Sequence, residues 1–167
     1  MQVCDLEPQG SAPWELLRKY GGEFGFFEKI KMGGVGSPKI IYASGLLELD
    51  QFVEEVAGSD IPYVNFEYLR NGILARINKT QYLKGVLISF DEIVSITLSN
   101  KFKYLRKPEN SMVTSKRKIY IGEGELEIRI DSDEVLVFQI MFQDSNGIES
   151  FFKKNKSLQS KFKSTIL

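Results

Sequence analysis

The sequence predicts a mainly β fold: a bent antiparallel sheet of seven strands, closed by one C-terminal amphipathic helix and preceded by an N-terminal extension. Three observations lead to this prediction. Residues 64–98 alternate apolar and polar side chains with the period of two that half-buried strands show. Residues 119–142 resume this alternation after a polar connection, and residues 146–163 carry apolar side chains at helical spacing. An antiparallel sheet with one apolar face needs a cover, and the helix is expected to supply it.

Residues 1–60 are expected to form the N-terminal extension, packed on the core of a domain that covers residues 61–167. A short helical turn is expected at the only tryptophan, Trp14. Trp14, Leu17 and Tyr20 are candidates to dock on the body of the domain, because their apolar surfaces need burial.

The rest of the extension contains two candidate strands and a helix. Residues 23–32 and 39–43 are the candidate strands, and the glycine-rich residues 33–38 between them are expected to form a flexible turn. Residues 45–57 predict a helix, because apolar side chains recur near the helical period and Gly58 is a natural stop.

Residues 64–98 are expected to form four short strands in an antiparallel meander. Asn71-Gly72 favours a type I′ hairpin between the first two, because both residues tolerate positive φ. Residues 78–81 and Asp91-Glu92 mark the next two turns. The alternating apolar side chains are Ile73, Ala75, Ile77, Tyr82, Val86, Ile88, Phe90, Val94, Ile96 and Leu98.

Three more strands are expected in residues 119–142. Gly122-Glu123-Gly124 is predicted to turn the chain after the first, and Asp131-Ser132-Asp133 after the second. The apolar side chains on one face of these strands are Leu126, Ile128, Ile130, Leu136, Phe138, Ile140 and Phe142. They would complete the apolar face of the sheet.

The closing helix is expected over residues 146–163. Asn146, with Glu149 three residues later, is a plausible N-cap arrangement. Lysines in the last turns suit the negative end of the helix dipole. The apolar stripe consists of Ile148, Phe151, Phe152, Leu158 and Phe162.

Composition favours one intracellular domain. A chain of 167 residues can bury a sizeable core, and its only cysteine, Cys4, cannot form an internal disulfide. No run of eighteen apolar residues exists, and the N-terminus is acidic where a signal peptide would be basic. We therefore expect a cytoplasmic protein. Zero net charge argues against a general nucleic-acid binder, although the charges come in blocks.

Catalytic and metal sites are not expected. The chain has no histidine, which excludes histidine-based acid–base chemistry and histidine-ligated metals. Cys4 lies beside Asp5, whose charge would raise the pKa of the thiol. Residues 33–37 match neither phosphate-loop pattern, and residues 131–134 lack the spacing of a calcium loop. We expect a protein that is not an enzyme and has no cofactor.

A basic cluster is the best candidate site for an anion or a partner. It comprises seven cations with only Glu109 against them, namely Lys101, Lys103, Arg106, Lys107, Lys116, Arg117 and Lys118. Such a cluster could collect an anionic head group or an acidic partner. The alternative that we favour is a solvated connection whose cations keep it soluble.

Two stretches resemble bacterial pleckstrin-homology-like (PH-like) domains. These are GILARINKTQYLKGVLISFDEIVSITL, and GELEIRIDSDEVLVFQIMF followed by NGIESFFKK, and the similarity covers about residues 61–163. The resemblance implies a bent seven-stranded sheet or barrel whose open end is plugged by the C-terminal helix, with Phe151 and Phe152 in the plug. Members bind phosphoinositides, peptides or partner proteins, and the fold itself is not catalytic.

The function expected from this resemblance is a non-catalytic binding or scaffolding module. It would recognise a protein or peptide partner through an exposed strand edge or a neighbouring groove. The alternative is peripheral attachment to anionic lipid through the basic residues of 101–118. Against lipid, lipid-binding PH domains usually carry basic residues in a longer loop between their first two strands. Here that connection is the tight Arg70-Asn71-Gly72.

Overall fold

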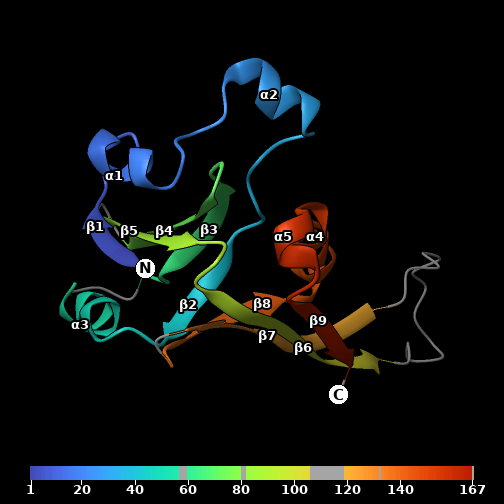
Figure 1. The fold of residues 1–167 in the computed structure, drawn as a ribbon. Coiled ribbons are helices and arrows are strands. Elements are labelled where there is room, and N and C mark those ends of the chain that lie inside the picture. Colours follow the sequence, from blue (N-terminus) through green and yellow to red (C-terminus); the bar gives the residue numbers. More distant parts are fainter. Residues whose placement is uncertain (57–59, 80–81, 106–118, 132, 167) are drawn as a thin grey trace.

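The computed structural model describes residues 1–56, 60–79, 82–105, 119–131 and 133–166 (Figure 1). Its strands are β1 (Gln2–Asp5), β2 (Ile40–Ser44), β3 (Tyr63–Tyr68), β4 (Gly72–Lys79), β5 (Tyr82–Ser89), β6 (Ile93–Leu105), β7 (Ile119–Ile130), β8 (Val135–Met141) and β9 (Phe162–Ile166). Its helices are α1 (Trp14–Lys19), α2 (Phe26–Lys31), α3 (Leu47–Glu55), α4 (Phe142–Lys154) and α5 (Lys156–Gln159). The fold is mainly β with helices near the C-terminal end, as predicted.

The strands of the described residues form one sheet in the order β1-β5-β4-β3-β2-β8-β7-β6-β9. Neighbours are antiparallel except β6 and β9, which run parallel. Two three-stranded meanders, β3–β4–β5 and β6–β7–β8, are joined by β2, which pairs with β3 and with β8. Because β1 and β9 are open edges, the sheet does not close into a barrel. The expected seven strands become nine, and the expectation of a barrel is wrong.

The expected four-stranded meander is wrong at its last strand. β3, β4 and β5 pair as predicted, but β6 crosses to the other half of the sheet and pairs with β7 and β9. Glu92 anchors the crossing: its carboxylate accepts a hydrogen bond from the Ser89 amide (2.8 Å), and its carbonyl accepts one from the Asp131 amide (3.0 Å). Local alternation predicts a strand here but carries no information about its partner.

β7 is one strand where the sequence predicts two strands and a turn. Gly122 and Gly124 continue its pairing, opposite Phe102 and Asn100 of β6. β6 has 13 residues and offers partners along this length, so the expected turn at Gly122–Gly124 is wrong. The turn between β7 and β8 is where the sequence predicts it, with Asp133 at a φ of 64°.

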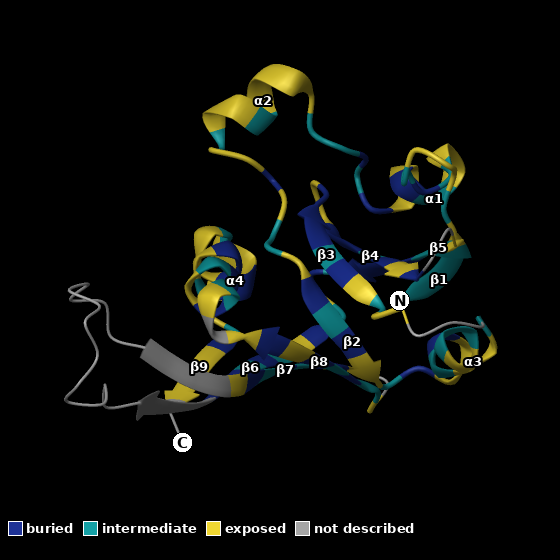
Figure 2. Cartoon of the chain, turned by 180° about the vertical axis from the view of Figure 1, so that it is seen from behind, coloured by how far each residue is buried: buried dark blue, intermediate teal, exposed yellow. Residues whose placement is uncertain are grey.

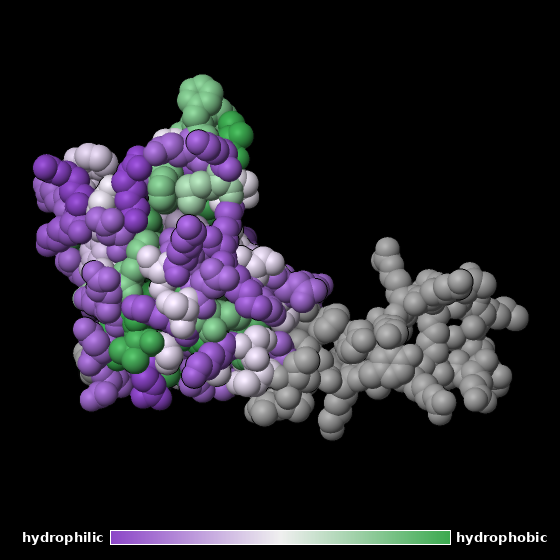
Figure 3. All heavy atoms as spheres, turned by 45° about the vertical axis from the view of Figure 1, so that its right-hand side comes forward, coloured by the Kyte–Doolittle hydropathy of each residue, from purple (hydrophilic) through white to green (hydrophobic). Residues whose placement is uncertain are grey.

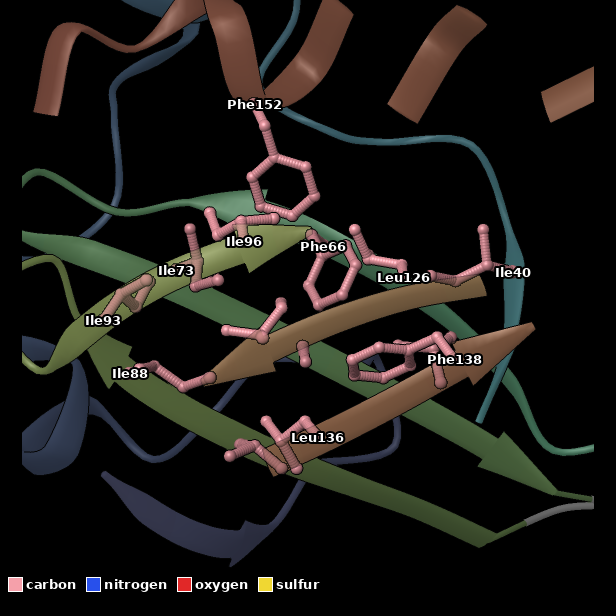
Figure 4. Packing of buried hydrophobic residues seen from close by; sticks show 14 of the residues in the cluster. Ile40, Phe66, Ile73, Ile88, Ile93, Ile96, Leu126, Leu136, Phe138 and Phe152 are labelled. Carbon is pink, nitrogen blue, oxygen red and sulfur yellow. The ribbon is translucent and has the colours of Figure 1, made fainter. Parts of the chain in front are cut away.

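The two meanders share one core, shown in Figure 4. Phe66 of β3 lies against Phe138 of β8, with ring centroids 5.2 Å apart, and against Phe152 of α4, at 5.5 Å. Phe151 stacks on Tyr68 at 4.2 Å. Phe151 and Phe152 of α4 are both buried, which confirms the burial expected for them.

The bounds of the C-terminal helix differ from the prediction. α4 begins at Phe142, so Asn146 is not its N-cap. Ser145 in its first turn is buried and donates a hydrogen bond to Asn100 Oδ1 of β6 (3.0 Å). Since this bond fixes the first turn against the sheet, the helix starts earlier than its capping pattern suggests.

The end of the chain is a strand and not a helix. Leu158 lies on α5, and Phe162 opens β9, which pairs with β6. Ile148, Leu158 and Phe162 are all buried as expected. The buried positions were therefore predicted correctly, while the backbone that presents them was predicted wrongly after Lys154.

Residues 23–32 contain α2 and are not the strand that was expected. The Gly25 amide donates a hydrogen bond to the Glu28 carboxylate (2.7 Å) at the start of the helix. Gly33 and Gly34 both have positive φ and end it. Capping at both ends stabilises a helix that alternation alone did not indicate.

β2 and α3 confirm the strand expected over 39–43 and the helix expected over 45–57. The loop before β2 is bonded to β3: the Tyr68 amide donates to the Val35 carbonyl (2.9 Å), and the Ser37 amide donates to the Phe66 carbonyl (2.8 Å). Because β2 lies between β3 and β8, the first sixty residues supply a central strand of the sheet as well as the β1 edge.

The N-terminal segment that contains α1 covers the outer face of β4 and β5 (Figure 2). Leu17 and Tyr20 are buried with Leu74 of β4 and Leu87 of β5, which confirms their expected docking. Trp14 is 64% exposed, so its expected docking is wrong. α1 has only six residues and turns Leu17 to the sheet, which leaves Trp14 outside the contact.

Candidate functional site

A hollow with a volume of about 670 Å³ lies on the outer face of β3 and β4. Its floor includes Tyr63, Asn65 and Asn78, which point away from the core because their strand neighbours Val64 and Ile77 are buried in it. Its walls come from the loop Pro8–Gly10, from Lys39, and from Asp60 and Ile61 before β3.

A second hollow of about 240 Å³ continues across β2 and β8 to the start of α4. It shares Lys39 and Tyr63 with the first hollow, so the two hollows adjoin, and we call them together the outer groove. Ile41, Gln139 and Met141 line this second part.

The floor of the outer groove follows the register of the sheet. Asn78 lies opposite Tyr63, Tyr63 opposite Ile41, and Ile41 opposite Gln139. This row crosses β4, β3, β2 and β8. With strands about 4.8 Å apart, the row spans about 14 Å.

The side chains of this row offer both polar and apolar contacts. Asn78 and Gln139 present amide groups, Tyr63 presents a hydroxyl group on an aromatic ring, and Ile41 is apolar. Within the part of the chain that the structure describes, no side-chain hydrogen bond occupies the three polar groups. They are available to an external donor or acceptor.

Charges are distributed along the outer groove. Lys39 borders both hollows and is exposed, whereas Asp60 borders the first and Asp144 the second. The groove thus carries Lys39 where its two parts meet and one of these carboxylates on each part, while Arg76, which also lines the first part, is paired with Glu67. This arrangement favours a ligand with an anionic group near its centre.

A largely buried ion-pair cluster fixes one wall of the groove. Glu67 on β3 pairs with Lys29 of α2, at 2.9 Å, and with Arg76 on β4. Arg76 Nε also donates to the Gly10 carbonyl (2.7 Å). Since Arg76 joins the loop to the sheet, the wall at Pro8–Gly10 is held in place.

The electrostatics of this cluster favour its charged state. Burial alone would raise the pKa of Glu67, but the Lys29 hydrogen bond and the charge of Arg76 outweigh it and lower that pKa. Burial would lower the pKa of Lys29, and the contacts with Glu67 reverse this and raise it. Both shifts keep the pair ionised near neutral pH.

Two members of the basic cluster expected from the sequence lie on a described strand. Lys101 and Lys103 lie on β6, in register with Glu123 and Ile121 of β7. The remaining members, Arg106, Lys107, Lys116, Arg117 and Lys118, lie outside the described residues. Anion or partner binding by this cluster stays a prediction.

Sequence reasoning missed the outer groove. Its floor comes from the polar positions of the same alternation that predicted the strands, such as Asn65 and Asn78. The missing information was the order of the strands: β3 and β8 meet only through β2, which was assigned to the extension. The local alternation of apolar and polar residues does not indicate a surface that is formed by strands distant in the sequence.

Chemistry elsewhere is limited. Within the described ranges, no group of three or more cysteine, aspartate and glutamate side chains could hold a metal ion. The pKa of Cys4 is raised, chiefly by burial and next by the Asp5 charge that the sequence suggested. No described helix combines the length and apolar character needed to cross a bilayer.

Comparisons of the chain with protein-family models, with curated proteins and with solved structures found no match.

Proposed function

We propose that this chain is a non-catalytic binding module that holds an extended segment of a protein partner in the outer groove. The observation that carries the proposal is the pair of adjoining hollows across four strands, with Tyr63 and Lys39 lining both. Reducing conditions in the cytoplasm would suit its single cysteine.

The length of the groove and its charges indicate the kind of peptide that would fit it. An extended peptide advances about 3.3 Å per residue, so the row of about 14 Å accommodates about four residues. An acidic side chain near the middle would face Lys39, and basic side chains toward the ends would face Asp60 and Asp144. The peptide backbone would exchange hydrogen bonds with the amides of Asn78 and Gln139.

The groove is also preorganised. β2 is paired on both sides, and the wall at Gly10 is tied to Arg76, so little ordering is needed when a ligand binds. The edges are less suited to strand addition. β1 has only four residues, and β9 carries exposed Lys163, a residue type that opposes edge pairing.

We further propose that residues 61–163 are a diverged PH-like domain. Six strands in two meanders followed by a helix support this, as does the position of Phe151 and Phe152 between the meanders. The insertion of β2 between β3 and β8 and the terminal β9 depart from the seven-stranded pattern. β2 is also the strand that builds the middle of the groove.

Panning a library of random linear peptides against the full chain tests the proposed function. Selected peptides should bind the wild type, and Tyr63→Ala and Lys39→Glu should each weaken their Kd about tenfold or more. Tyr82→Ala removes an exposed tyrosine outside the groove and should leave Kd unchanged. Equal affinity of the wild type and both groove variants, or failure to select any peptide, would refute the proposal.

A further inference from the structure

α2 presents large apolar side chains to solvent, while its Glu28 and Lys29 contact charged side chains of the body. Phe26, Phe27 and Ile30 are 73%, 83% and 61% exposed. Figure 3 shows hydrophobic side chains projecting at the top of the molecule, the position of α2 in Figure 1. A surface helix of a globular protein normally has the opposite polarity. We call these three side chains the α2 tip.

Ion pairs fix this orientation. Glu28 accepts two hydrogen bonds from the Arg70 guanidinium, at 2.9 and 2.8 Å, and Lys29 donates to Glu67 at 2.9 Å. Arg70 also lies over the ring of Phe24, 5.1 Å from its centroid. A bidentate pair is geometrically specific, so the α2 tip projects in a defined direction.

The unpaired charge next to the tip is positive. The carboxylates of Glu28 and Glu67 are paired as described, and Glu23 lies 3.5 Å from Lys29. At the C-terminal end of the helix, Lys31 is exposed, and no described carboxylate pairs with it. Lys154 donates to the Gly34 carbonyl (2.7 Å), again without a carboxylate partner in the described residues.

The area of the tip distinguishes between two kinds of partner. A phenylalanine buries about 150–250 Å². Two of them with one isoleucine offer on the order of 500 Å², below the roughly 800 Å² per partner of a standard protein interface. Membrane attachment has no such threshold, because its strength grows with the inserted apolar area and with attraction to anionic lipid.

We propose that the α2 tip inserts into the headgroup region of an anionic membrane, with Lys31 and Lys154 contacting the lipid phosphates. This inference is independent of the outer groove and of the basic cluster at 101–118. It assigns the chain a place on a membrane surface, with Phe26 and Phe27 as the anchors.

Co-sedimentation with phosphatidylcholine vesicles, with and without phosphatidylserine, tests the proposal. The wild type should bind the phosphatidylserine vesicles at low salt, and binding should weaken as salt rises. The double variant Phe26→Ser/Phe27→Ser should bind these vesicles at least about tenfold more weakly than the wild type. Leu47→Ser, which removes a 75% exposed leucine on α3, is the matched control and should bind like the wild type.

A single-tryptophan protein reports insertion directly. Trp14→Phe combined with Phe27→Trp places the only tryptophan at the tip, and its emission should shift to the blue with anionic vesicles. No binding by the wild type, equal binding by the double variant, or an unshifted emission would overturn the proposal. A wild-type dimer that the double variant dissociates, without vesicle binding, would show instead that the tip is a protein interface.

Discussion

The two meanders of the sheet differ in how many of their faces are covered. In β3–β4–β5 the inner face meets the core, and much of the outer face lies under the N-terminal segment, where Leu74 and Leu87 are buried. In β6–β7–β8 the inner face meets the same core, but outward positions such as Arg129 and Gln139 are exposed. The outer groove lies between these two regions, where the cover of the N-terminal segment ends at Pro8–Gly10.

The burial patterns along the strands show the same difference between the two meanders. Along β4, four consecutive residues from Gly72 to Ala75 are buried, whereas β8 alternates between buried and more exposed positions. Continuous apolar runs are typical of strands covered on both faces, and alternation is typical of strands covered on one. The run at Gly72–Ala75 therefore indicates that another segment covers the sheet there.

Removing the aromatic side chain shared by both meanders should have the largest effect. Phe152→Ala should lower the free energy of unfolding by about 3–5 kcal/mol, because Phe152 is buried against Phe66 of the first meander and Phe162 beside the second. Chemical denaturation measures the change, with Phe27→Ala as an exposed control that should change it by less than about 0.5 kcal/mol. Two separate unfolding transitions in the wild type would contradict a shared core.

The next largest effect is expected when one outward side chain of each meander is shortened and the losses of stability are compared. Leu74→Ala should cost about 2–4 kcal/mol, because it opens a cavity under the N-terminal segment. Val137→Ala, at a partly exposed outward position of β8, should cost less than about 1 kcal/mol. Similar costs for the two variants in the same denaturation experiment would remove the distinction between the meanders.

The ion pairs at the boundary of the covered region should contribute less. Glu67→Gln should cost about 2 kcal/mol at pH 7, below the usual 3–5 kcal/mol for breaking a buried pair, because Lys29 is one-third exposed. The variant leaves Arg76 without the Glu67 carboxylate and leaves Lys29 with only Glu23, 3.5 Å away. A stability equal to that of the wild type would show that the cluster does not hold the groove wall.

Lowering the pH should reduce the loss of stability that Glu67→Gln causes. The pKa of Glu67 is lower in the folded chain than its ordinary value, so the unfolded state takes up its proton first as the pH falls. The stabilisation is present above the ordinary pKa and is lost as the pH falls through the lowered one. The difference between the wild type and Glu67→Gln should therefore shrink from pH 7 toward acid, and a constant difference would contradict this.

Much of the fold was predictable because strands and buried positions leave a local pattern. The alternation in residues 64–98 predicted strands at β3, β4, β5 and the start of β6, and the apolar stripe predicted the burial of Phe151 and Phe152. The partner of β6 and the place of β2 were not predictable, because pairing depends on contacts between residues far apart in the sequence. α2 was missed because its apolar residues face solvent and because Glu28 contacts Arg70, which is distant in the sequence.

The candidate site was the least predictable part. The basic residues in 101–118 are close together in the sequence, whereas the residues that line the outer groove are scattered along it. Its central residues, Lys39 and Tyr63, are separated by α3 in the sequence and meet only because β2 and β3 are paired. The pairing register of the strands is what brings these polar residues together in the outer groove.

Nuclear magnetic resonance mapping of a selected peptide on the isotope-labelled full chain tests the proposed groove most directly. Amide shifts should concentrate on the cross-strand row Asn78, Tyr63, Ile41 and Gln139, with smaller changes at Gly10 and Asp144. Resonances of the β1 and β9 edges should stay in place. Shifts confined to either edge, or to residues 101–118, would show that the partner binds elsewhere and would contradict the outer groove as the binding site.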